Sequence, residues 1–266
     1  MVLTWILAAL CSGVSCGLLG VYLVGLEMPF LGIAMAHAAL AGAVIGYLVG
    51  GPVWLWAGGA AWGTGLMLAR LAYSSVRSDL GALSSIVFST SMGVAFLGIG
   101  LAKGEMSSLL GLLWGNILFV RPAETALLLA VTVLLGVFLS VSGRLLDALI
   151  FARRSETYAF DPRPVFIVFM TLTSVIITLN LQLVGGLLMY ALLANAAAAA
   201  FEIAEDMVAV RRYAALFGLL ATLGGLTISW VLDLPIGACV VLISTACYAA
   251  AFWARRRDVW QKRRSI

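Results

Sequence analysis

Long apolar runs, separated by short polar breaks, follow one another along the whole chain. Most runs contain about 20 mostly apolar residues, which is the length that an α-helix needs to cross a hydrocarbon core. The breaks contain charged residues, proline or glycine. The pattern therefore predicts eight or nine transmembrane helices, at residues 3–24, 30–49, 53–73, 83–102, 122–142, 164–182, 184–201, 213–232 and 235–254.

The fold class follows from the uniform polarity of these runs. A strand of a membrane barrel would alternate apolar and polar residues over about ten positions, whereas these runs are apolar throughout. An all-α polytopic fold is expected, with residues 1–266 as one transmembrane domain. The first run lacks a preceding basic segment and is predicted to be a helix rather than a signal peptide. Residues 106–120 are too short to span the membrane and are predicted to form a re-entrant or interfacial helix.

Composition excludes several classes of protein. Hydrophobic residues make up 63% of the chain, charged residues make up 11%, and the mean hydropathy is +1.11, which a water-soluble domain does not reach. The four cysteines lie within apolar runs and show no metal-binding spacing, so buried free thiols are expected. Phosphate-binding loops and protease motifs are absent from the sequence. The chain is therefore predicted to be a transport subunit without enzymatic activity or an ATPase site of its own.

Basic residues predict the orientation of the helices. They crowd the C-terminal tail at residues 255–266, which should therefore face the cytoplasm. The same rule explains the pI near 9.0 without a nucleic-acid partner. Counting back from the tail places the connection at residues 143–163 on the cytoplasmic side.

This long cytoplasmic connection is the best candidate for docking a soluble partner. Residues 152–160 are expected to form either a short amphipathic helix along the membrane face or a solvated loop. The candidate coupling residues within the connection are Arg153, Arg154, Glu156 and Tyr158.

Small residues recur in several spans. In lipid, such residues let helix backbones approach closely, because no hydrophobic force draws one helix to another. Helix packing is therefore the role predicted for Gly32, Ala36, Gly42, Gly185 and Gly186.

Four segments, in order, resemble the ABC permeases for zinc, manganese and iron. Residues 28–42, MPFLGIAMAHAALAG, are similar to the signature segment of that family. Residues 110–118 resemble its Gly-Asp motif, residues 184–193 its Val-Gly-Ala-Leu-Leu helix, and residues 233–238 the Asp-x-Pro-x-Gly turn before its last helix. The resemblance implies a homodimeric permease subunit in the cell membrane, powered by separate cytoplasmic ATPase subunits that use ATP. It also implies an extracytoplasmic solute-binding protein that delivers the cargo.

His37 is the only histidine of the chain and the leading candidate for a metal ligand. It falls near the middle of a predicted span, where a polar side chain is costly unless it has a partner. Imidazole suits borderline transition metals, and a pore site needs few ligands because the ion must leave again. The alternative is a histidine that hydrogen-bonds between helices. Met35 and Asn116 are weaker candidates for a thioether and an amide ligand.

The sequence also departs from the family pattern. The family places an aspartate four residues before the histidine, and this chain has Ile33 there. Asn116 replaces the aspartate of the Gly-Asp motif, Ser89 occupies a position where some members have a second histidine, and Ala196 replaces a proline.

These observations predict a permease for a divalent transition metal, with zinc first and manganese or iron next, and with no permanently bound cofactor. Two alternatives stay open. The same scaffold could move a non-metal or metal-complex cargo, or the chain could be an ATP-independent secondary transporter.

Overall fold

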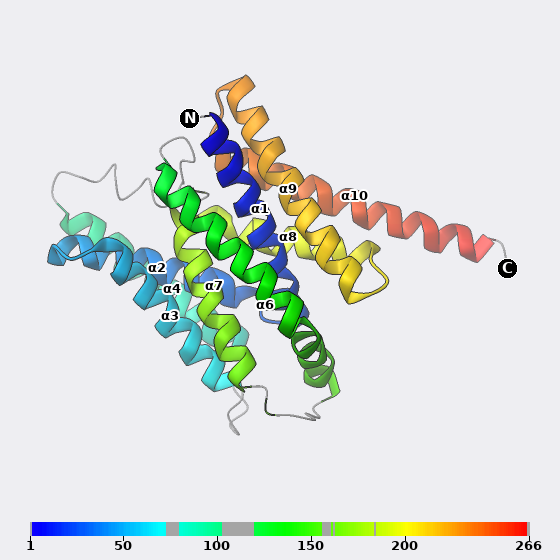
Figure 1. Ribbon diagram of the computed structural model, residues 1–266, viewed down its shortest axis with the longest axis horizontal. Coiled ribbons are helices and arrows are strands. Elements are labelled where there is room, and N and C mark those ends of the chain that lie inside the picture. Colours follow the sequence, from blue (N-terminus) through cyan, green and yellow to red (C-terminus); the bar gives the residue numbers. More distant parts are fainter. Residues whose placement is uncertain are drawn as a thin grey trace.

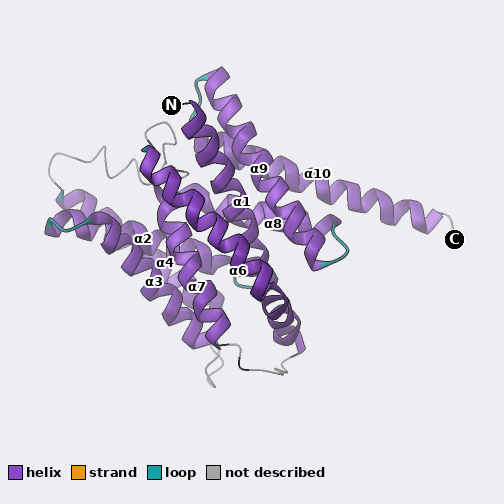
Figure 2. Cartoon of the chain, viewed as in Figure 1, coloured by secondary structure: helices purple, strands orange, loops and turns teal. Residues whose placement is uncertain are grey.

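The computed structural model describes residues 2–72, 80–102, 120–155, 161, 163–183 and 185–264. In this part of the chain every regular element is an α-helix, and Figure 2 shows no strand among the described residues. The predicted all-α fold is therefore confirmed.

Nine helices make up the described part, and each of the nine predicted spans corresponds to one of them. They are α1 (Val2–Gly25), α2 (Pro29–Val49), α3 (Val53–Ala72), α4 (Leu80–Leu101), α6 (Pro122–Ser155), α7 (Arg163–Leu183), α8 (Gly186–Ile203), α9 (Met207–Leu232) and α10 (Ile236–Arg264). Seven of these helices are long and apolar enough to cross a membrane. The remaining two helices, α3 and α8, do not meet that criterion over their described residues. The predicted helix at residues 106–120 falls almost wholly outside the described residues.

Local chemistry explains where several helices begin and end. Pro29 and Pro122 occupy first helical positions, where the missing N–H of proline costs nothing. The Asp206 carboxylate accepts a hydrogen bond of 2.7 Å from the Ala209 N–H and so caps α9. Gly50 ends α2 in the left-handed conformation, which glycine adopts without strain.

The helix α6 is longer than the predicted span at residues 122–142. It continues to Ser155, so the first part of the proposed cytoplasmic connection is helical. Leu146, Leu149 and Ile150 lie on one face of this extension and are buried. Arg153 and Arg154 belong to the last turn of α6, whereas Glu156 and Tyr158 lie outside the described residues.

The helices form two packed groups that α8 and α7 connect (Figure 1). In the first group α2 packs against α3 and α4, and α3 also packs against α7. In the second group α1, α8, α9 and α10 pack together, while α6 lies against α1 and α7. The helix α10 extends past its neighbours toward the C-terminus (Figure 1).

Candidate functional site

His37 lies on α2, within the first group of helices, and its side chain is fully buried. Its Nδ1 lies 2.9 Å from the carbonyl oxygen of Ile33, one turn earlier on the same helix. Because a carbonyl oxygen can only accept, Nδ1 must carry the proton and donate this bond. The Nε2 atom is therefore left with an available lone pair.

The Nε2 atom of His37 is buried and has no hydrogen-bond partner among the described residues. Leaving such a group unsatisfied costs about 1–3 kcal/mol, so native proteins rarely do so without a reason. In the part of the chain that the structure describes, no second helix supplies a hydrogen bond to this histidine. The observed arrangement, with one ring nitrogen donating to a carbonyl and the other left as a bare lone pair, is the one that metal-binding histidines adopt.

An aromatic ring from α4 covers the imidazole. The Phe88 ring stands edge-on to the His37 ring, with the two centroids 4.6 Å apart and the planes at 76°. Sequence reasoning did not identify Phe88. In the run at residues 83–102, hydroxyl and apolar residues are spread over all sides of the helix, so the pattern does not indicate which side chain faces α2.

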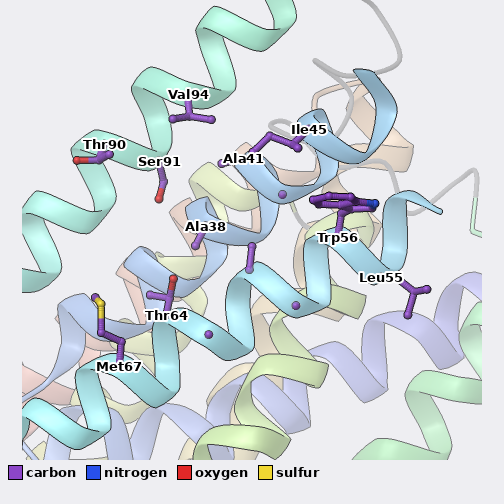
Figure 3. Close-up of a pocket in the computed structure, with 14 residues that line it drawn as sticks. Ala38, Ala41, Ile45, Leu55, Trp56, Thr64, Met67, Thr90, Ser91 and Val94 are labelled. Carbon is purple, nitrogen blue, oxygen red and sulfur yellow. The ribbon is translucent and has the colours of Figure 1, made fainter. Parts of the chain in front are cut away.

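An open groove of about 690 Å³ lies between α2, α3 and α4, the first and last of which carry His37 and Phe88. Ala38 and Ala41 line it from α2, and Thr90 and Ser91 line it from α4. Figure 3 shows Ala38, Thr64 and Ser91 around the space that separates the three helices. Hydroxyl groups supply the polar atoms of the groove's side chains, together with the Trp56 indole N–H.

The other candidate ligands do not join His37. Met35 is buried on the opposite side of α2, because residues two apart on a helix are separated by about 200°. Its thioether faces Gly65 of α3. Ser89 is exposed and donates to the Ile86 carbonyl of its own helix, at 3.0 Å. Asn116 lies outside the described residues. Among the described residues, no three His, Cys, Asp or Glu side chains gather into a metal-binding group.

The predicted packing residues occupy two kinds of position. Gly32 and Ala36 are buried within α2, and Gly42 faces the Trp56 backbone of α3 so closely that a Cβ would collide with it. Gly185 precedes α8 with a φ of 88°, and Gly186 is the first residue of that helix. The structure therefore gives Gly185 a conformational reason for being glycine.

A polar cluster that the sequence analysis missed joins three helices. Arg211 of α9 donates to both carboxylate oxygens of Asp147 on α6, each at 2.7 Å, and to the Tyr22 hydroxyl of α1 at 3.0 Å. Asp147 and Arg211 are 16% and 18% exposed. In the sequence, Asp147 falls within the predicted cytoplasmic connection at residues 143–163, and Arg211 stands beside Arg212.

A second set of polar contacts joins α8 to α10. The Asn195 amide donates to the hydroxyls of Ser244 and Thr245, each at 3.1 Å, and Arg255 pairs with Glu202 at 2.8 Å. Side-chain hydrogen bonds of this kind hold helices together in lipid.

Comparison with known proteins identifies the family. A model of the ABC 3 transport family matches residues 1–255. The chain belongs to the ABC 3 transport family. The resemblance found in the sequence is therefore confirmed, and the chain is a multi-pass membrane protein of this family.

Relatives within the ABC 3 family match almost the whole chain. The "Manganese transport system membrane protein MntC" of Halalkalibacterium halodurans is 27% identical over 256 residues, which are 92% of this chain and 84% of that protein. The "High-affinity zinc uptake system membrane protein ZnuB" of Haemophilus influenzae is 23% identical over 90% of this chain and 92% of that protein.

A solved structure shows the same fold. "PsaBC from Streptococcus pneumoniae in complex with Fab" superposes with a TM-score of 0.80 at 20% identity, covering 94% of this chain and 90% of the other. At this level of identity the agreement supports the arrangement of helices and not the individual residues of the site.

Proposed function

We propose that this chain is the permease subunit of an ABC importer that carries a divalent first-row transition metal into the cytoplasm. The family membership supports a transport role, and the relatives named above are manganese and zinc systems. The metal is the cargo in this proposal and not a resident cofactor.

The observation that carries the proposal is the bare, buried Nε2 of His37. The carbonyl of Ile33 fixes the tautomer that leaves this atom able to bind a cation. A neutral imidazole adds no charge to the membrane interior, and a site with few protein ligands releases its ion readily. Both properties suit a site that the ion occupies briefly on its way across the membrane.

Manganese is the leading cargo and zinc is the second candidate. From the sequence, zinc was expected first, with manganese or iron next. The relatives' names support manganese more strongly, since several of them are manganese systems from different bacteria. Hydroxyl oxygens of Thr64, Thr90 and Ser91 in the adjacent groove are donors of the kind that manganese accepts.

We further propose that separate cytoplasmic ATPase subunits supply the energy and that two copies of this chain form the pore. An extracytoplasmic binding protein would deliver the ion, and the C-terminal tail would face the cytoplasm. The end of α6, with Arg153 and Arg154, and the residues that follow it, including Glu156 and Tyr158, would transmit the motion of the ATPase. The chain would bind and release the ion without any covalent reaction.

Replacement of His37 tests this proposal. His37→Ala should lower manganese uptake by cells at least tenfold, or about 1.4 kcal/mol, because the ion loses its protein ligand. The variant should still reach the membrane and co-purify with the ATPase subunit. Thr227→Ala is the control, since Thr227 is exposed on α9 and bonds only to its own helix in the described structure. Unchanged uptake by the His37 variant would refute the proposed site.

A further inference from the structure

The side chain of Phe88 stands between His37 and its surroundings on the α4 side. Its ring contacts the imidazole at 4.6 Å between centroids, and the imidazole is 0% exposed. A phenyl ring has no strong hydrogen-bond donor or acceptor, so this contact adds to the burial of the imidazole and leaves its nitrogen unsatisfied. In this arrangement a cation has no direct access to Nε2.

The groove is lined by residues close in sequence to both rings. Ala38 and Ala41 line the groove one residue and one turn after His37, and Thr90 and Ser91 line it just after Phe88 (Figure 3). A cavity of about 150 Å³ can hold a benzene molecule. The groove of about 690 Å³ is several times larger than this, so it has the volume to hold a phenyl ring.

We propose that Phe88 is a lid that controls access to His37, with its ring packed edge-on against the imidazole in the described state and turning toward the groove to admit the cation. The identity of the cation rests on the proposed function, whereas the covering of His37 by Phe88 is a property of the fold. Phe88 is a positioning residue in this account, because it acts through His37 and does not bind the ion.

Chemical modification of His37 measures the lid directly. Diethyl pyrocarbonate acylates neutral imidazole, and this chain contains a single histidine, so peptide mass mapping reports on one site. The full-length chain is purified with a tag that contains no histidine and is placed in lipid nanodiscs without metal. We expect Phe88→Ala to raise the modification rate of His37 by about tenfold, which corresponds to ~1.4 kcal/mol of opening free energy.

Two matched variants separate the lid from a general loosening of the fold. Phe96→Ala makes the same change two turns later on α4, where the ring is 52% exposed, and should leave the rate at the wild-type value. Phe88→Tyr keeps the ring and should keep His37 protected. An equal rate in the wild type and in Phe88→Ala, or an equal increase in Phe96→Ala, would overturn the proposal.

A poorly folded alanine variant does not leave the question open. If Phe88→Ala is not monodisperse after purification, Phe88→Leu supplies the same test, because leucine removes the ring and fills much of its volume. Its modification rate must exceed that of Phe88→Tyr if the lid exists.

The lid and the proposed function can fail separately. A faster modification of Phe88→Ala, together with full manganese uptake by His37→Ala, would support the lid and refute the role of His37 in transport. An unchanged modification rate, together with loss of uptake in His37→Ala, would refute the lid and leave the permease assignment intact.

Discussion

At the scale of single residues, one backbone carbonyl decides the chemistry of the site. The Ile33 carbonyl holds the Nδ1 proton of His37, and this bond leaves the lone pair of Nε2 free to bind. The resemblance to the family implies an aspartate at this position in its other members. In this chain the residue at position 33 contributes its backbone and not a carboxylate.

Restoring that carboxylate should strengthen manganese binding. Ile33 and His37 are one turn apart on the same face of α2, so an aspartate at position 33 could share an ion with the imidazole. Ile33→Asp is expected to lower the KM of manganese uptake about tenfold, because manganese prefers oxygen ligands. The buried charge costs about 2.5–3.5 kcal/mol at the centre of a helix, so less protein should accumulate.

The uncharged variant Ile33→Asn is the matched control for this prediction. It has nearly the same shape as the aspartate but no charge, and its KM should stay close to that of the wild type. Uptake rates normalised to the amount of permease give both KM values. Equal KM values for the aspartate variant and the wild type would contradict the placement of the ion beside His37.

At the scale of helices, the Arg211 cluster is the strongest polar connection in the described part of the chain. It joins α1, α6 and α9 through Tyr22, Asp147 and Arg211, and its two charged side chains are largely buried. Breaking such a pair leaves one charge without compensation, which costs more than the pair itself contributes.

Arg211→Leu should therefore destabilise the folded protein by about 1–3 kcal/mol, as expected for lost hydrogen bonds to a charged group. Thermal unfolding of the purified chain in nanodiscs measures the change. Arg212→Leu is the control, because Arg212 is the next residue and is exposed. The double variant with Asp147→Leu should recover part of the loss, since no lone charge remains. A double variant less stable than Arg211→Leu would contradict this account.

The helices could be predicted from the sequence, but their facing residues could not. Each apolar run is long enough to be recognised, and the predicted starts of most helices differ little from the observed ones. Helix ends were less predictable, because α6 and α10 continue beyond the apolar part as amphipathic or charged helix. The length of a membrane span and the length of a helix are different quantities.

The candidate site was predictable only in part, for a related reason. His37 was recognisable as a lone polar residue in an apolar run, and its burial agrees with that expectation. Phe88 was not recognisable, because α4 has hydroxyl and apolar residues on all its sides and its rotation depends on packing against α2. The partnership of Arg211 with Asp147 spans 64 positions and likewise depends on the fold.

At the scale of the whole molecule, the fold is that of a permease, and its energy source lies outside the described chain in our proposal. The family and the structural neighbour place the helices in a known arrangement. The homodimer, the ATPase subunits, the binding protein and the cytoplasmic C-terminus stay predictions. They are linked, because a permease of this kind would move its cargo only when the whole assembly is present.

Uptake by the reconstituted assembly tests the central claim most directly. The purified permease, combined with its ATPase subunit and binding protein, is placed in lipid vesicles, and manganese and zinc entry is measured with and without ATP on the ATPase side. We expect ATP-dependent uptake of manganese, weaker uptake of zinc, and loss of both in the His37→Ala assembly. Equal manganese entry without ATP, or ATP-driven entry that His37→Ala leaves unchanged, would contradict the account.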